Sequence, residues 1–203
     1  MTLSALLTLM GLQALIAISP GPAAVLTIKT AAAQGVRAGF ALSFGLALAI
    51  VIWASAALAG LSVIFEVAPY LQTTLRIAGG IFLIWIGIAM FRHSKEPLLD
   101  ARSATTTQGV QLVRLGVITN LANPKALAYF AAVFVGIMPA DPTLAAALTV
   151  LLVIFMIEFA WYATLSILLS RPSPRRLYQN GKVHLDRVFG GMITALGARI
   201  AYN

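Results

Sequence analysis

The stretch Ala17-Ile18-Ser19-Pro20-Gly21-Pro22-Ala23 interrupts an apolar segment that carries no charged side chain from position 1 to position 28. As one straight helix, residues 3–33 would extend over roughly 46 Å, whereas the hydrocarbon core of a bilayer is about 30 Å thick. Pro20 and Pro22 both lack the amide proton that a helix interior needs. We therefore predict a membrane helix that breaks at this point.

A second stretch, Asn120-Leu121-Ala122-Asn123-Pro124-Lys125, repeats the pattern about half the chain later. Asn is a favoured N-cap and Pro is favoured at the first helical position, so we expect a new half-helix to begin at Asn123-Pro124. Gly21-Pro22 predicts the same. The start of a half-helix presents unpaired N–H groups and a partial positive charge, which suit a carboxylate. The alternative is a pair of kinks that serve packing and bind no ligand.

The composition indicates a polytopic membrane protein. Of 203 residues, 60% are hydrophobic and only 10% are charged, and the mean hydropathy is +0.93. Soluble domains usually carry about 25% charged residues, so a water-soluble globule is excluded. The absence of cysteine also excludes a disulfide scaffold and cysteine metal sites.

Six apolar stretches are long enough to cross a bilayer, once a few flanking residues are included. The fold class that we predict is all-α, with six transmembrane helices of which the first and the fourth are broken. The predicted spans cover residues 3–33, 38–65, 77–91, 112–138, 143–169 and 185–202.

The basic residues predict the orientation of these spans. Ten of the 14 Lys and Arg residues lie in the loops after spans one, three and five. Because basic loops stay in the cytoplasm, both termini are expected outside it. The net charge of +8 therefore reflects topology and contact with anionic lipids. A nucleic-acid partner is not expected, since no folded basic domain is present to hold one.

The two halves of the chain resemble each other. Arg76-Ile77-Ala78-Gly79-Gly80 opens span three, and Arg187-Val188-Phe189-Gly190-Gly191 opens span six. Each half has an odd number of spans, so the second copy must cross the membrane in the opposite direction, as in many secondary transporters. We predict one transporter domain over residues 1–203, with repeat one at about 1–92, a cytoplasmic linker at about 93–111 and repeat two at about 112–203. Chance similarity between apolar sequences is the alternative.

Two charges, Lys125 and Glu158, lie near the middle of their spans, where each costs roughly 3 kcal/mol even on the lenient insertion scale. Lys125 would add to the attraction of an anion at the second break. Glu158 would bind the amino group of a substrate or a coupling proton, and Trp161 shares its helical face. The alternative, which does not exclude function, is that Lys125 and Glu158 pair as a structural contact.

No catalytic pattern was found. The two histidines, His93 and His184, fall in predicted cytoplasmic loops, and the chain has no phosphate-binding Gly-Lys loop. We therefore predict no enzyme, no metal site and no cofactor. Transport would have to draw on an ion gradient, a counter-substrate or a downhill concentration.

Four motifs in order along the chain resemble the LysE/RhtB family of amino-acid exporters. They are Ser19-Pro20-Gly21-Pro22, Gly35-Val36-Arg37-Ala38-Gly39, Leu75-Arg76-Ile77-Ala78-Gly79-Gly80 and Thr119-Asn120-Leu121-Ala122-Asn123-Pro124-Lys125-Ala126. The resemblance implies export of amino acids or related compounds across the bacterial inner membrane, driven by the proton-motive force or by exchange. The family commonly has Asp or Asn where this chain has Ala23, which favours a neutral substrate over a strongly basic one.

The residues expected to bind the substrate are Ser19, Pro20, Gly21, Pro22, Asn120, Asn123, Pro124, Lys125, Glu158 and Trp161. Glu158 is also the candidate for proton coupling. The expected partners are a small amino-acid substrate, the lipid bilayer and, through the small residues Gly35 and Gly39, a possible second copy of the chain. The alternatives to an amino-acid exporter are an inorganic cation exporter and a non-transporting membrane scaffold.

Overall fold

The structure is a computed structural model that describes residues 2–19, 21–67, 69–95, 109–130, 138 and 142–202. Of the predicted site residues, Pro20 lies outside these ranges. So do most of the predicted linker and residues 131–137 of the fourth predicted span.

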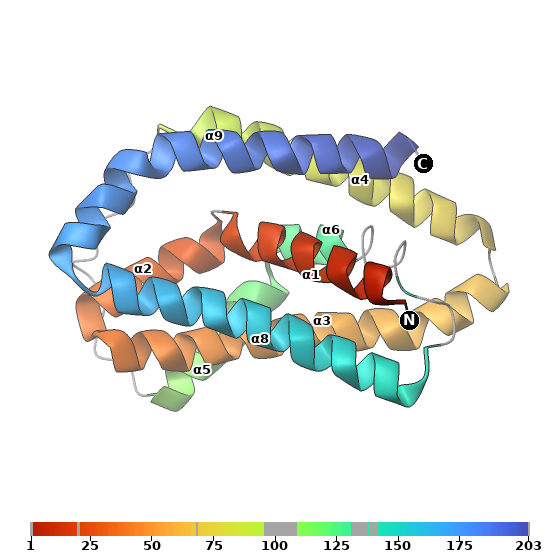
Figure 1. Cartoon of the computed structure of the whole chain (residues 1–203), viewed down its shortest axis with the longest axis horizontal. Helices are drawn as coiled ribbons and strands as arrows, with labels where there is room; N and C mark the ends of the chain where they lie inside the picture. The colour runs from red at the N-terminus through yellow and green to blue at the C-terminus, as the bar shows by residue number, and fades with distance from the viewer. Residues whose placement is uncertain are drawn as a thin grey trace.

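Every regular element in these ranges is a helix, as predicted (Figure 1). The helices are α1 (Leu3–Ile18), α2 (Pro22–Gln34), α3 (Val36–Val67), α4 (Pro69–His93), α5 (Gly109–Leu121), α6 (Pro124–Tyr129), α8 (Leu144–Leu169) and α9 (Pro172–Tyr202).

Both predicted helix breaks are present. α1 ends at Ile18 and α2 begins at Pro22 with Gly21 as N-cap, and the axes of the two helices differ by 59°. α5 ends at Leu121 and α6 begins at Pro124. In both cases a proline takes the first helical position, where its missing N–H costs nothing.

Two described helices, α3 over Val36–Gly60 and α8, are long and apolar enough to cross a membrane, and the bent pair α1–α2 would add a third span. The remaining crossings of the predicted six stay a prediction. The predicted loop after span five is wrong at one point, because α9 begins at Pro172 and continues through His184. The first half of α9 is polar, so it was predicted as a loop. A helix that extends beyond the apolar layer needs no apolar periodicity.

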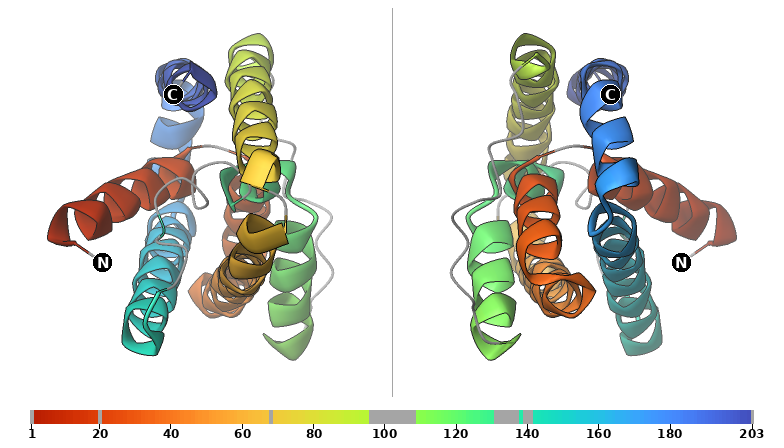
Figure 2. Two further views of the ribbon diagram at one scale, coloured as in Figure 1. Left: turned by 90° about the vertical axis from the view of Figure 1, so that its right-hand side faces the viewer. Right: turned by 90° about the vertical axis from the view of Figure 1, so that its left-hand side faces the viewer.

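The helices form two layers. In Figures 1 and 2, α4 and α9 run side by side along one edge, while α8, α3 and α5 form a row opposite them. The short α6 and the two ends of α1 and α2 that meet at the first break lie between these layers, whereas the N-terminal part of α1 projects away from them (Figure 2). Buried side chains occur at both breaks, Ser19 at the first and Asn123 at the second. The N- and C-termini lie at the same end of the molecule (Figure 1).

Glycines allow the closest helix contacts. A Cβ atom added at Gly80 would lie 2.7 Å from the Gly197 carbonyl oxygen, and one added at Gly197 would lie 2.6 Å from the Gly80 oxygen. Seven residues away along each helix, Gly87 and Gly190 approach each other in the same way. The backbones of α4 and α9 are therefore in direct contact.

The small residues Gly35 and Gly39 serve contacts within the chain. Gly35 joins α2 to α3 with a φ of +84°, a conformation that favours glycine. A Cβ atom at Gly39 would collide with the side chain of Ser166 on α8. The possible homodimer stays a prediction.

Changing Gly197 to Ala should separate α4 from α9. We expect a loss of about 1–3 kcal/mol in the free energy of unfolding, measured by denaturant titration of the purified protein in detergent. Gly11→Ala on α1 is the matched control, because no atom lies within 4 Å of the added Cβ. Equal stability of the two variants would contradict the close packing of α4 against α9.

Candidate functional site

Lys125 joins the two helix breaks. Its ammonium group donates hydrogen bonds to the carbonyl oxygens of Ile16 (2.9 Å) and Ser19 (2.8 Å), at the C-terminal end of α1. The last carbonyls of a helix carry a partial negative charge, which a cation stabilises. Lys125 is only 6% exposed, so this contact is formed away from solvent. The sequence analysis predicted that Lys125 lies at the second break. It did not predict the contact of Lys125 with the first break.

Glu158 lies halfway along α8 and is 3% exposed. One carboxylate oxygen accepts a hydrogen bond from Gln13 Nε2 (2.9 Å), and the other accepts one from Asn120 Nδ2 (3.2 Å). Gln13 comes from α1 and Asn120 from the last turn of α5. The carboxylate is therefore held by side chains from both broken spans.

Asn120 and Asn123 connect Glu158 to Lys125. Asn120 Nδ2 also donates to the Leu46 carbonyl oxygen of α3 (2.9 Å), and its Oδ1 accepts from Asn123 Nδ2 (3.2 Å). Asn123 Oδ1 then accepts the backbone N–H of Lys125 (3.0 Å) and caps α6. A chain of hydrogen bonds thus runs from the Glu158 carboxylate to the backbone N–H of Lys125 at the start of α6.

Lys125 and Glu158 share this network without direct contact. Among the residues that the structure describes, no ion pair joins the ammonium of Lys125 to the carboxylate of Glu158. Isolated charges are costly in a low-dielectric interior, and here neutral amides and carbonyls take the place of the opposite charge. The site can therefore offer a cation and an anion to one small ligand.

The N-terminal ends of α2 and α6 differ in whether a side chain caps their first backbone N–H groups. At α6, the Asn123 side chain already occupies one of the first amides. At α2, the N-cap Gly21 has no side chain, so no cap bond forms, and Lys125 Nζ would lie 3.4 Å from a Cβ at this position. The start of α2 and the Lys125 ammonium therefore lie close together, and both attract anions.

The other predicted residues at the breaks contribute less. Ser19 is fully buried, but its hydroxyl donates to the sulfur of Met90 (3.4 Å), so it holds α1 against α4. Pro22 is exposed. For Pro124 the structure describes the backbone alone, which begins α6.

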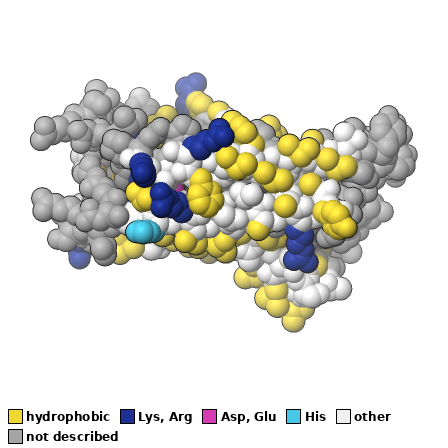
Figure 3. Space-filling model, turned by 90° about the horizontal axis from the view of Figure 1, so that it is seen from above, with side chains coloured by type: hydrophobic (Ala, Val, Ile, Leu, Met, Phe, Trp, Pro, Cys, Tyr) yellow, Lys and Arg dark blue, Asp and Glu magenta, His cyan; other side chains and the backbone are white. Residues whose placement is uncertain are grey.

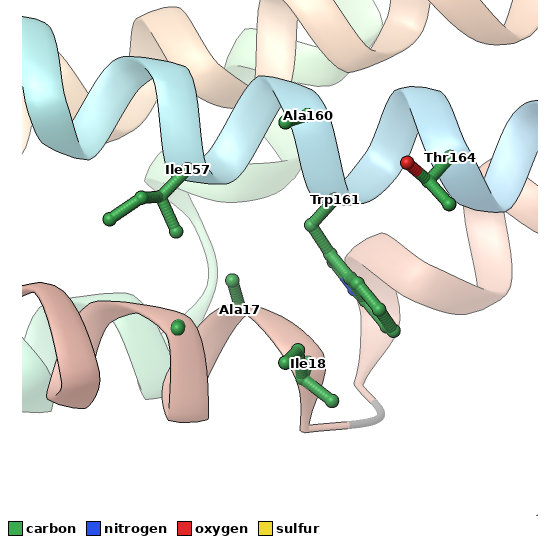
Figure 4. Close-up of a pocket in the computed structure, with 7 residues that line it drawn as sticks. Ala17, Ile18, Ile157, Ala160, Trp161 and Thr164 are labelled. Atoms are coloured by element: carbon green, nitrogen blue, oxygen red, sulfur yellow. The ribbon is translucent and has the colours of Figure 1, made fainter.

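Trp161 lies beside this network in a pocket of about 250 Å³ between α1 and α8 (Figure 4). The pocket is lined by Ala14, Ala17, Ile18, Ile157, Ala160, Trp161 and Thr164. The Trp161 ring points toward the end of α1, next to the first break (Figure 4). Its indole nitrogen is buried and has no hydrogen-bond partner within the described part of the chain.

Gln13 is a site residue that the sequence analysis missed. It is 0% exposed, its amide nitrogen binds Glu158, and its Oε1 has no hydrogen-bond partner among the described residues. A glutamine inside a long uncharged span is a signal that could have identified it, since a polar side chain at that depth needs a partner.

Basic side chains gather toward one end of the molecule. Figure 3 shows most of the visible Lys and Arg side chains on the left of that view, with an apolar surface over the middle. No group of three or more His, Cys, Asp or Glu side chains that could hold a metal ion occurs in the described ranges.

Comparisons with known proteins find one matching family and several named relatives. A sequence profile of the family described as LysE type translocator matches residues 5–203. The threonine efflux protein of Escherichia coli (strain K12) is 30% identical over 188 residues, which cover 90% of each chain. The homoserine/homoserine lactone efflux protein of Salmonella typhi is 30% identical over 193 residues, which cover 92% of this chain and 91% of the relative. No solved structure gives a significant match.

Replacing Asn120 by Leu should destabilise the fold strongly. The change would leave the Leu46 carbonyl, the Glu158 carboxylate and the Asn123 amide each short of one hydrogen bond. We expect a loss of about 2–4 kcal/mol in the free energy of unfolding, measured in detergent.

Thr149→Ala on α8 is the control for this change. The Thr149 hydroxyl bonds to the Ala145 carbonyl of its own helix at an exposed position, so its removal should alter stability by less than about 0.5 kcal/mol. A similar small effect for Asn120→Leu would show that the network does not hold the helices together.

Proposed function

The chain belongs to the family of LysE type translocators, and we propose that it exports neutral amino acids or close derivatives from the cytoplasm. The names of its relatives support this substrate class, since they refer to the efflux of threonine and of homoserine or its lactone. Membership of a transporter family also fits the apolar helices and the buried charges of the site.

The observation that carries the proposal is a pair of buried, opposite charges without direct contact, Lys125 at the second helix break and Glu158 within α8. An amino acid is a zwitterion, with an ammonium and a carboxylate a few ångströms apart. The carboxylate would bind at the Lys125 ammonium and the open start of α2, and the ammonium would bind Glu158. The substrate would thereby replace the carbonyl and amide groups that now solvate the two charges.

The amides between the charges suit this exchange. Asn120 and Asn123 each present both donors and an acceptor, so they can bond to one another in the empty site and to the substrate in the filled one. Glu158 is in addition the candidate for proton coupling, because a carboxylate that binds a proton releases the ammonium that it held. Protonation from one side of the membrane would then drive release on that side.

Two inverted repeats would provide the frame for this exchange. In support, the bent pair α1–α2 packs on α8 while α5 packs on α3, and α4 packs on α9. If each helix of one half is exchanged for its counterpart in the other half (α1–α2 for α5–α6, α3 for α8 and α4 for α9), the same packing pattern results. Such symmetry allows one arrangement to open toward the cytoplasm and the mirror arrangement to open outward.

We place the basic end of the molecule in the cytoplasm and both termini outside, in the inner membrane of a bacterium. The basic residues support this orientation by the positive-inside rule. The placement of the two chain ends together, away from the basic end, fits an even number of crossings.

Counterflow in proteoliposomes tests the function directly. Vesicles loaded with an unlabelled neutral amino acid should accumulate the labelled one, and an imposed pH gradient should change the rate. Glu158→Gln and Lys125→Ala should each reduce this flux to that of vesicles without protein, because each change removes one of the two charges that bind the zwitterion.

The control for these variants is Arg199→Ala, which removes an exposed charge near the end of α9. All three should insert in the membrane and elute as a single species in detergent. Unchanged flux in both site variants would reject the site. Absence of flux in the wild type would favour a scaffold, and cation flux without amino-acid flux would favour an inorganic cation exporter.

Single cysteines test the orientation, since the chain has none of its own. In intact cells, Thr2→Cys and Tyr202→Cys should react with a membrane-impermeant maleimide. Arg171→Cys, between α8 and α9, should react only after the cells are opened. The reverse pattern of labelling would overturn the proposed topology.

A further inference from the structure

The sequence deprives one carbonyl group at the first break of its helical partner. In an α-helix, the carbonyl of a residue accepts the N–H of the residue four positions later. Four positions after Ile16 the chain has Pro20, which carries no N–H. Ile16 is buried, and buried carbonyl groups are nearly always hydrogen-bonded. The Ile16 carbonyl therefore needs a donor from elsewhere in the protein.

The second break meets the same need locally. Asn120 precedes Pro124 by four positions, so its carbonyl also lacks a helical donor. The backbone N–H of Asn123 donates to this carbonyl (3.2 Å). At the first break, the Lys125 ammonium donates to the Ile16 carbonyl (2.9 Å). The first break is thus completed by a cation that comes from the other half of the chain.

Neutral oxygen atoms hold this cation. The carbonyls of Ile16 and Ser19 both accept from the Lys125 ammonium, and the partial negative charge at the end of α1 favours a cation. Lys182 provides a contrast. It also donates to a carbonyl beside a helix end, that of Ser94 (3.3 Å), but its ammonium forms an ion pair with Asp186 (2.6 Å).

The ammonium of Lys125 fills the space where a free cation would bind. A Cβ atom at Gly21 would lie 3.4 Å from Lys125 Nζ and 3.7 Å from its Cε, so the glycine leaves room for the charged end of the side chain. Backbone carbonyls replace the hydration shell of potassium in channels, and the ends of broken helices bind the coupling ion in many transporters. Here the carbonyls at a broken end bind a cation that is tethered to α6.

We propose that the first helix break is a site for one small monovalent cation, and that the Lys125 ammonium is its resident cation. No inorganic ion is then required at this position, and truncation of the Lys125 side chain opens the site to a free primary ammonium. This inference rests on the contacts of Lys125 and goes beyond the proposed function, so it holds whether or not the chain transports amino acids.

Thermal unfolding of the purified protein in detergent tests the site. Lys125→Ala removes three methylene groups and the ammonium, which together correspond to n-propylammonium. The variant should melt at a lower temperature than the wild type. Propylammonium chloride should then raise its melting temperature by about 2–4 °C at about five times the dissociation constant. Tetramethylammonium chloride at the same concentration should not, because its cation has no N–H to donate.

Lys125→Met and Lys29→Ala are the controls. Methionine keeps an apolar side chain of similar length in the site, so propylammonium should not stabilise Lys125→Met. Lys29 of α2 is only partly buried, and its truncation leaves the Lys125 ammonium in place. Lys29→Ala and the wild type should therefore respond equally to propylammonium and to tetramethylammonium.

Replacement of sodium and potassium by N-methylglucamine tests the wild type. Because the site already holds the Lys125 ammonium, the melting temperature should not change. Amino-acid counterflow in proteoliposomes, measured in the same two media, should proceed at the same rate. A wild type that sodium or potassium specifically stabilises would overturn the proposal.

Equal effects of the two ammonium salts on Lys125→Ala would also overturn it. If this variant unfolds during purification, its yield as a single species in detergent, with one or the other salt present throughout, replaces the melting temperature. Equal yields would again reject the site. Absence of amino-acid flux in the wild type, together with stabilisation of Lys125→Ala by propylammonium, would reject the proposed function and leave the cation site standing.

Discussion

The arrangement depends on one buried cation that stabilises the end of a broken helix. A helix that stops inside the bilayer exposes carbonyl groups that no water can reach, and such groups are tolerated only where protein or a wet cavity satisfies them. At the end of α1, the ammonium of Lys125 satisfies two of these carbonyls from the other half of the chain. The first break is therefore stable only when the second break lies next to it.

This dependence explains why polar residues concentrate at the breaks. Lys125 brings a full charge into the interior, and a buried charge needs an opposite charge or several hydrogen bonds. Glu158 provides the opposite charge, and its hydrogen bonds reach the backbone N–H of Lys125 through Asn120 and Asn123. The Lys125 ammonium binds the α1 carbonyls, the Glu158 carboxylate binds amide donors, and no direct contact between the two charges occurs in the described part of the chain. A structural requirement of the fold has thus brought a buried cation and a buried anion together, and these are the two charges to which the proposed function assigns a zwitterion.

The parts of the structure that local chemistry determines could be predicted from the sequence. Proline at a first helical position and asparagine as N-cap define both breaks within a few residues, and the apolar stretches define α3 and α8. Contacts across the two halves could not be predicted in this way. The partners of Lys125 and the role of Gln13 depend on how α1 packs against α6 and α8, which no local pattern encodes. The helical start of α9 was missed because its polar residues show no apolar periodicity.

Complete burial of the site has a consequence for transport. Gln13, Asn120, Lys125 and Glu158 are all buried, so a substrate can enter only if helices separate. The glycine contacts make α4 and α9 one closely packed unit, whereas the bonds at the breaks are a small number of hydrogen bonds to Lys125. In the proposed mechanism, a substrate carboxylate would compete with the α1 carbonyls for that ammonium. Binding would therefore weaken the link between the two broken spans, and this weakening would couple occupancy of the site to its opening.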